Sequence, residues 1–224
     1  MIAVGGTVGI TTTIPVEAVL AAGMRPLDLN NLFASHPESA GLVERALAAG
    51  FPQSSCAWLK GIYGALLSKD APDLIVGVVR GDCSGTGVLL EAISMLGLEV
   101  VPFSYPYPPS LPEMRREIEK LCSALGTTLE AAEEWREKLV PVRRLLSEMD
   151  SLCWEENLVT GSENHLWLVA SSDFNGDPER FRCDLEAFMS EARMRKPLDR
   201  REGIPFAREV RLGYIGVPPV VPEI

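Results

Sequence analysis

Cys83 stands where a thiol could do chemistry. It follows the apolar run of residues 74–79 and the turn Arg80-Gly81-Asp82, and it precedes the sequence Ser-Gly-Thr-Gly. A short, apolar, β-branched run followed by a glycine turn and a helical pattern predicts a buried parallel strand. Because open parallel sheets bind ligands beyond the carboxyl ends of their strands, Cys83 is a candidate site residue by position.

Cys56 is a second candidate because it opens a predicted helix. The sequence Ser-Ser-Cys precedes the apolar pattern of residues 57–66, which places Cys56 in the first turn. At a helix N-terminus the free N–H groups and the helix dipole stabilise a thiolate, the form of cysteine that binds metals. The alternative is a small buried side chain. Gly61 and Gly64 in this helix cost stability unless a neighbouring element packs closely against them.

The remaining cysteines favour structural roles. The five cysteines of the chain include no Cys-x-x-Cys pair, so the sequence does not predict a disulfide framework. Cys122 and Cys153 fall within or just after charged amphipathic helices, where we expect core packing, and Cys183 lies inside a later helix. His165, alone in a helical pattern, is expected to be structural.

The elements that would position these residues alternate between strand and helix patterns. Strands are predicted at residues 2–8, 24–29, 74–79 and 98–103, with helical patterns between them. This alternation predicts an α/β fold with a Rossmann-like parallel sheet flanked by helices. Two amphipathic helices with charged outer faces follow the fourth strand and predict a helical insertion there.

Helix starts can be predicted from capping residues. Candidate capping boxes occur at Ser110 with Glu113 and at Thr127 with Glu130. Three further predicted caps are Thr13, Ser162 and Asp177, the last directly before a proline.

We expect residues 1–205 to form one α/β domain that includes a helical segment at 110–196. Residues 206–224 contain a predicted strand at 210–215 and a Gly-Val-Pro-Pro turn. They would be the start of a second α/β unit or a C-terminal strand.

Composition excludes several classes of partner. The net charge of −10 argues against a nucleic-acid surface, which needs a concentrated basic field. No apolar stretch reaches the about 18 residues needed to span a bilayer, and no basic residue precedes the first apolar run, as a signal peptide would require. We therefore expect a cytoplasmic protein without nucleic-acid or membrane partners.

The order of these segments resembles the D-component family of 2-hydroxyacyl-CoA dehydratases, whose relatives include subunits of benzoyl-CoA reductase. The resemblance is carried by IPVEAVLAAGMRPLDL after the first strand and by SSCAWLKGIYGALL in the place of the family's first cysteine-bearing helix. It continues with PDLIVGVVRGDCSGTGVLLE in the place of the family's strand that ends in cysteine, and with GSEN and VRLGYIGVPP further on. It covers most of the chain.

The resemblance implies a [4Fe–4S] cluster held through three cysteines. Cys56 and Cys83 match the first two, and the third position would lie beyond Ile224. Ser84, Gly85 and Thr86 at the helix start would hydrogen-bond cluster sulfur or a substrate carbonyl oxygen, with Ser84 as the candidate catalytic residue. The alternative is that these three residues only cap the helix.

The chemistry that the resemblance implies is the radical reductive dehydration of an acyl-CoA thioester. An ATP-dependent activator protein would supply one electron, and a homologous partner subunit or a second copy of the chain would complete the assembly. In such a system the cofactor performs the difficult electron-transfer chemistry. The protein binds and orients the substrate and excludes water.

Two other interpretations remain open. One is a non-catalytic scaffold or electron-transfer partner of the same family. The other is a CoA- or nucleotide-binding α/β domain without a cluster, although no Gly-x-Gly-x-x-Gly sequence follows a predicted strand. Iron content would separate the cluster-bearing interpretations from the last one.

Overall fold

The computed structural model describes residues 5–68 and 71–198. It divides the chain into two compact units, and the division falls between Glu137 and Lys138, within helix α7 (Leu129–Trp154). In the described part of the chain, no helix is both long and apolar enough to cross a membrane. Each unit is considered by itself below.

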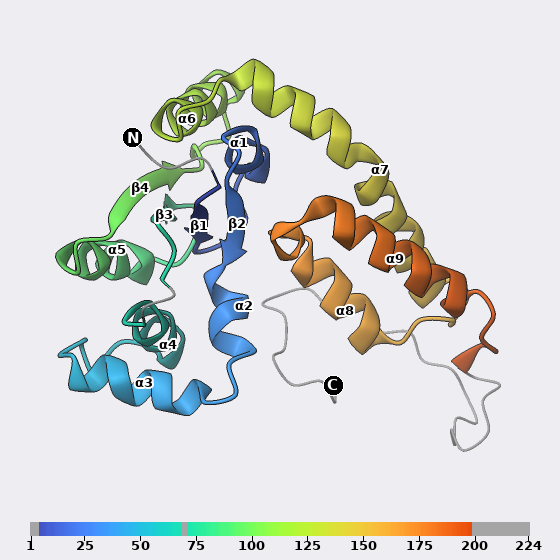
Figure 1. The fold of residues 1–224 in the computed structure, drawn as a ribbon, viewed down its shortest axis with the longest axis horizontal. Coiled ribbons are helices and arrows are strands. Elements are labelled where there is room, and N and C mark those ends of the chain that lie inside the picture. Colours follow the sequence, from blue (N-terminus) through green and yellow to red (C-terminus); the bar gives the residue numbers. More distant parts are fainter. Residues whose placement is uncertain (1–4, 69–70, 199–224) are drawn as a thin grey trace. The chain divides into compact units, whose positions relative to one another are not determined.

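A four-stranded parallel sheet forms the centre of the first unit (Figure 1). Its strands are β1 (Thr7–Ile10), β2 (Arg25–Asp28), β3 (Leu74–Arg80) and β4 (Glu99–Ser104). The strand order is β2-β1-β3-β4, so β1 pairs with β2 on one side and with β3 on the other. The direction of winding therefore reverses between β1 and β3, and such a switch point is where open α/β sheets bind ligands.

The helices that precede α7 in this unit pack on the two faces of the sheet or on one another. They are α1 (Val16–Ala21), α2 (Leu29–Ala34), α3 (Ser39–Ala48), α4 (Ala57–Leu66), α5 (Gly85–Met95) and α6 (Leu111–Ala124). Buried residues of α1 and α6 share one core with one face of the sheet. Buried residues of α2, α3, α4 and α5 share a second core with the opposite face. This arrangement confirms the predicted α/β fold.

Strand β3 shows why the apolar run of residues 74–79 has no polar positions. Leu74, Val76 and Val78 are fully buried in the core with α1 and α6, whereas Ile75 is buried in the core with α4 and α5. Gly77 faces Leu90 of α5 so closely that a Cβ there would lie 2.4 Å from a methyl carbon of Leu90. Because a central parallel strand is buried on both faces, it lacks the alternation of apolar and polar residues that marks a half-buried strand.

The two glycines of α4 lie where neighbouring helices approach closely. A Cβ at Gly61 would meet the ring of Phe33 in α2 at 2.1 Å, and one at Gly64 would meet the carbonyl oxygen of Leu42 in α3 at 1.9 Å. The expectation that something packs tightly against these glycines is confirmed. Their cost in helix propensity is offset by the close contact with α2 and α3.

Three predicted helix caps were wrong by one or two residues. The cap predicted at Thr13 is replaced by Pro15, which makes no side-chain bond. The cap predicted at Thr127 is replaced by Thr128, whose hydroxyl accepts from the N–H of Ala131 at 3.2 Å.

The third error is at Ser162. Thr160 caps α8 (Gly161–Ala170) instead, because Glu163 lies three residues after Thr160 and completes a capping box. The predicted caps at Ser110 and Asp177 are confirmed by hydrogen bonds from Glu113 N–H and Arg180 N–H.

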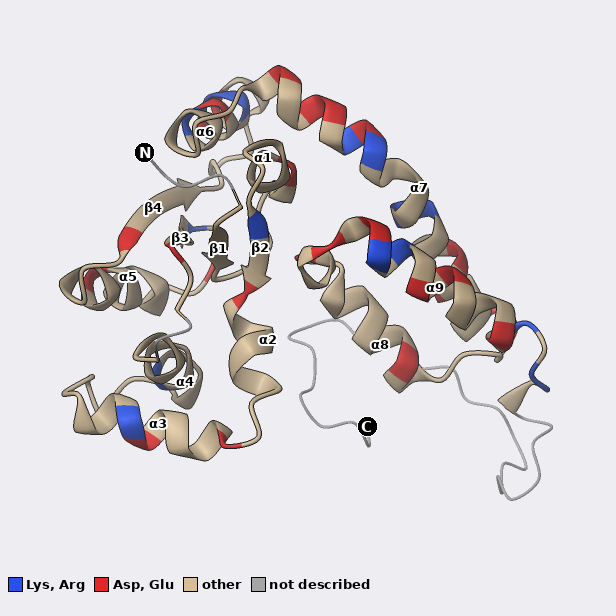
Figure 2. Cartoon of the chain, viewed as in Figure 1, with Lys and Arg blue, Asp and Glu red and all other residues tan. Residues whose placement is uncertain are grey.

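The second unit is helical and contains the end of α7, α8, a short 3₁₀ turn (Phe174–Gly176) and α9 (Pro178–Ala192). Trp167 of α8 packs against Phe181 and Phe188 of α9, with ring centroids 5.2 and 5.5 Å apart. Figure 2 shows Lys, Arg, Asp and Glu along α7 and α9, whereas α4 and α5 carry few. The helical insertion predicted after the fourth strand is confirmed.

The predicted domain boundary between residues 205 and 206 and the predicted strand at 210–215 lie outside the described residues. The division that the structure does show, at Glu137 and Lys138, falls inside the predicted helical segment.

The glycines of α4 and α5 give a matched pair of substitutions. We expect Gly64→Ala to lower the free energy of unfolding by about 1 to 3 kcal/mol, because the new methyl group meets the Leu42 carbonyl. Gly87→Ala in α5 meets nothing within 4 Å, so we expect a gain of up to about 1 kcal/mol from helix propensity. Urea unfolding of both variants measures this, and changes of the same sign would contradict the packing.

Candidate functional site

Cys56 is the N-cap residue of α4. Its backbone is extended, and its Sγ accepts a hydrogen bond from the N–H of Leu59 at 3.5 Å. The residue is exposed to solvent. Cys56 therefore takes the capping role that serine or aspartate usually has at an N-cap, and its sulfur is directed at the free N–H groups of the first turn.

Cys83 lies in the turn between β3 and α5. Its Sγ accepts from the N–H of Gly85 at 3.4 Å, and its carbonyl oxygen accepts from the N–H of Thr86 at 3.0 Å. Cys83 is also exposed. Both candidate thiols thus accept backbone hydrogen bonds at the start of a helix.

The two helix starts are in direct contact. A Cβ on Gly85 would lie 2.5 Å from Cδ1 of Leu59 and 3.5 Å from the Sγ of Cys83. Leu59 is the residue whose N–H bonds to Cys56, and Gly85 is the residue whose N–H bonds to Cys83. The thiols therefore belong to adjoining turns of α4 and α5, on the same side of the sheet.

The residues that follow Cys83 differ in what they can offer a ligand. Ser84 is exposed, and its side chain makes no capping bond to α5. The N–H of Gly85 is directed at the Cys83 sulfur. Thr86 is buried at 2% exposure, and its hydroxyl donates to Oδ2 of Asp82 at 3.3 Å, which braces the turn.

A partly buried polar network at the same edge of the sheet was not predicted from the sequence. The side-chain amide of Asn30 donates to the carbonyl oxygen of Thr11 at 2.8 Å and to Oδ1 of Asp28 at 2.9 Å. Its Oδ1 accepts from the indole N–H of Trp58, two residues after Cys56. No local pattern in the sequence indicates a pairing across 28 residues, because it depends on how α4 docks.

Tyr105 bridges the loops that follow β1 and β4. Its hydroxyl donates to the carbonyl oxygen of Thr13 at 2.8 Å. Its side chain covers Gly81, whose φ of +99° and lack of a Cβ let the ring approach. Burial raises the pKa of the Tyr105 phenol, and the carboxylate of Glu17 adds to the rise. The phenol therefore stays protonated and keeps the turn before Cys83 covered.

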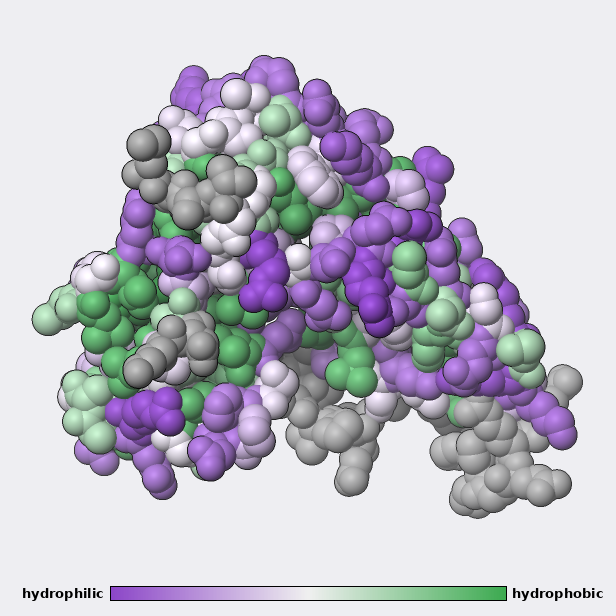
Figure 3. Space-filling model, viewed as in Figure 1, coloured by the Kyte–Doolittle hydropathy of each residue, from purple (hydrophilic) through white to green (hydrophobic). Residues whose placement is uncertain are grey.

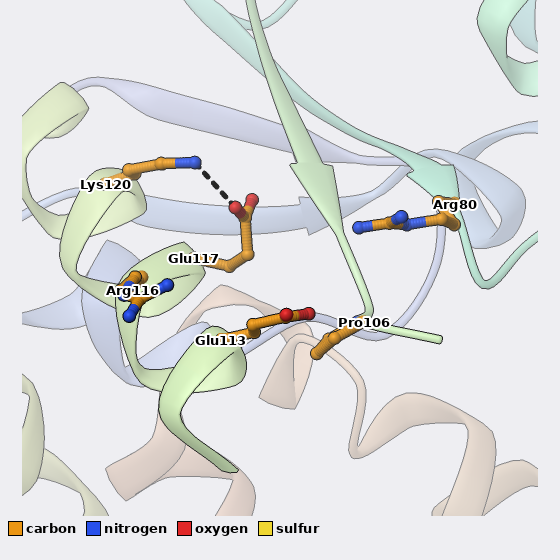
Figure 4. Close-up of a pocket in the computed structure, with 6 residues that line it drawn as sticks. All are labelled: Arg80, Pro106, Glu113, Arg116, Glu117 and Lys120. Atoms are coloured by element: carbon orange, nitrogen blue, oxygen red, sulfur yellow. Dashed lines mark hydrogen bonds and ion pairs between the residues drawn. The ribbon is translucent and has the colours of Figure 1, made fainter. Parts of the chain in front are cut away.

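A surface hollow of about 230 Å³ lies beside the ends of β3 and β4 (Figure 4). Its lining combines three cations and two carboxylates with one proline: Arg80, Arg116, Lys120, Glu113, Glu117 and Pro106. Lys120 forms an ion pair with Glu117 at 2.7 Å. The hollow is on the α6 side of the sheet, whereas Cys56 and Cys83 are on the α4 and α5 side, so it is separate from the thiol site.

The described residues supply only part of an iron–sulfur site. Within residues 5–68 and 71–198, no three Cys, His, Asp or Glu side chains gather in a metal-binding group. Burial raises the pKa of the Cys122 thiol in the core, and burial followed by the charge of Asp150 raises that of Cys153. Cys56 and Cys83 fit two thiolate positions, and a cluster with four ligands would take the others from elsewhere.

Comparison with known proteins adds one finding. No curated protein matches the chain. The family model described as 2-hydroxyglutaryl-CoA dehydratase, D-component, matches residues 11–224, which include strands β2, β3 and β4 and both helix-start cysteines. This chain, with its exposed thiols on two adjoining helix starts, belongs to the 2-hydroxyglutaryl-CoA dehydratase D-component family.

Proposed function

We propose that the chain is the iron–sulfur subunit or domain of a 2-hydroxyacyl-CoA dehydratase and that Cys56 and Cys83 hold one [4Fe–4S] cluster. The observation that carries this proposal is the contact between Leu59 and Gly85, which brings the two helix starts together. Both thiols are exposed, and both accept an N–H bond. Membership of the family supports the substrate class.

In this proposal the chain holds the two thiolates at its surface, so their negative charge is not buried. The N–H of Leu59 and the N–H of Gly85 would each donate to a ligating sulfur, and such bonds tune the potential of an iron–sulfur group. The bound cluster would supply the low-potential electron that drives the loss of the hydroxyl group from a 2-hydroxyacyl-CoA. Tyr105 and Gly81 would keep the turn before Cys83 fixed.

Ser84 is the proposed hydrogen-bond donor to the thioester carbonyl oxygen. Its hydroxyl is exposed, next to Cys83 in the chain, and is not used to cap α5. A donor aimed at a developing oxyanion lowers the barrier more than it strengthens ground-state binding. Gly85 serves the Cys83 sulfur, and Thr86 acts through Asp82 on the shape of the turn.

A partner subunit is part of this proposal. Val88, Met95 and Leu96 of the α5 segment are 49%, 87% and 39% exposed, and Figure 3 shows hydrophobic residues gathered over α5. Exposed apolar surface of this kind is typical of protein interfaces. We propose a homologous subunit or a second copy of the chain as the partner, and an ATP-dependent activator protein as the electron donor.

The second candidate function is a non-catalytic scaffold or electron-transfer subunit of the same assembly. It is favoured by one observation: the described residues bring no third ligand to Cys56 and Cys83. A CoA- or nucleotide-binding domain without a cluster would instead show no iron at all.

The ligand assignment can be tested by iron content. After anaerobic reconstitution we expect the wild-type protein to bind iron and sulfide, and Cys56→Ser and Cys83→Ser each to lose most of it. Cys183→Ser is the matched control, because Cys183 is also exposed but lies on α9 of the second unit.

Two results would count against the assignment. A wild-type protein that stays colourless and iron-free removes the cluster. Equal losses in all three variants remove Cys56 and Cys83 as its specific ligands.

The role of Ser84 can be tested by the rate of dehydration. In the assembled system, with partner and activator, we expect Ser84→Ala to lower kcat by about 10²-fold, the usual effect of losing one oxyanion donor. Its iron content should stay unchanged. Ser94→Ala is the control on the same helix, since the Ser94 hydroxyl donates to the carbonyl of Glu91. A full rate for Ser84→Ala, or a loss of its iron, would refute the donor role.

A further inference from the structure

Both polar atoms of the Asn30 side-chain amide have hydrogen-bond partners. An indole N–H can only donate, so Oδ1 of Asn30 must face Trp58. A carbonyl oxygen and a carboxylate oxygen accept, so Nδ2 faces Thr11 and Asp28. This combination of one acceptor and two donors belongs to an amide. Aspartate would place a second carboxylate against Asp28, and leucine would remove the side-chain partner of the Thr11 carbonyl oxygen and of the Trp58 indole N–H.

The Asn30 junction, formed by Thr11, Asp28, Asn30 and Trp58, joins three elements. Thr11 follows the end of β1 and Asp28 caps α2, and they are 6% and 5% exposed. Trp58 lies in the first turn of α4, and its ring packs edge-on against Phe33 with centroids 5.3 Å apart. The hydroxyl of Thr11 in turn accepts from Val78 N–H of β3 at 3.1 Å. The start of α4 is therefore tied to the carboxyl ends of β1 and β3.

The two thiols differ in how they are held. Cys83 follows the last residue of β3 by a short turn, so the sheet places it directly. Cys56 follows residues 49–55, which form neither helix nor strand, so its position depends on how α4 docks. The close contacts at Gly61 and Gly64 hold the middle of α4. The Trp58 bond to Asn30 is a directional contact between its first turn and α2.

We propose that Asn30 is a positioning residue for Cys56. Through Trp58 it would hold the first turn of α4 in the place where the sulfur of Cys56 can bind the same group as the sulfur of Cys83. This inference rests on the proposed function for the identity of that group, while the mechanical link from Asn30 to the first turn stands on the hydrogen bonds alone.

Amide hydrogen exchange tests the mechanical link in the protein without cluster. In Asn30→Leu we expect the amide of Lys60, which donates to the Cys56 carbonyl at 3.3 Å, to exchange about tenfold faster. Amides in the second half of α4 and in α5 should keep their wild-type rates, because those segments are held by other contacts. Trp58→Phe should reproduce the effect while keeping an aromatic ring against Phe33. Asn31→Ala changes the next residue of α2, which lies outside the junction. It should leave the exchange rates of Lys60 and of the other α4 and α5 amides unchanged.

The amount of iron bound completes the test. In the same reconstitution we expect Asn30→Leu and Trp58→Phe to bind less iron than the wild type and Asn31→Ala to bind as much. Faster exchange throughout α4 and α5, or no change at Lys60, would overturn the inference. Faster exchange confined to Lys60 with unchanged iron content would also overturn it. If Asn30→Leu does not fold, Trp58→Phe decides. If the wild type binds no iron, the proposed function fails while the exchange result still decides the link to Asn30.

Discussion

The contact between the starts of α4 and α5 is the constraint on which the site depends. Gly85 has no side chain, and this allows Leu59 to lie against the backbone that follows Cys83. The same two residues provide the N–H groups that face the two thiols. A Cβ at position 85 would lie 2.5 Å from Cδ1 of Leu59, so a larger residue there would force the Leu59 side chain to move.

The rest of the first unit supports this contact from both sides. Gly61 and Gly64 bring α4 close to α2 and α3, and Gly77 lets Leu90 of α5 pack onto the centre of the sheet. The helices that carry the thiols are thus packed closely, while most charges of this acidic chain lie on other helices (Figure 2).

Much of this arrangement could be predicted from the sequence, and the remainder depended on tertiary packing. The buried strand before Cys83, the helix after Cys56 and the close approach at Gly61 and Gly64 follow from apolar runs, turn residues and helix propensity. The cap at Thr128 was missed because Thr127 is adjacent and can also cap, whereas the cap at Thr160 is indicated locally by Glu163 three residues later. The Asn30 junction was missed because its partners are far apart in the sequence and meet only after α4 has docked.

The central claim is that Cys56 and Cys83 bind one iron–sulfur group together. The most direct measurement is the iron content of the double variant, with both cysteines changed to serine, compared with each single variant. Ligands of one shared group are not additive, so the account predicts that the double variant loses no more iron than either single variant. Losses that add, with each cysteine accounting for its own share of the iron, would contradict it.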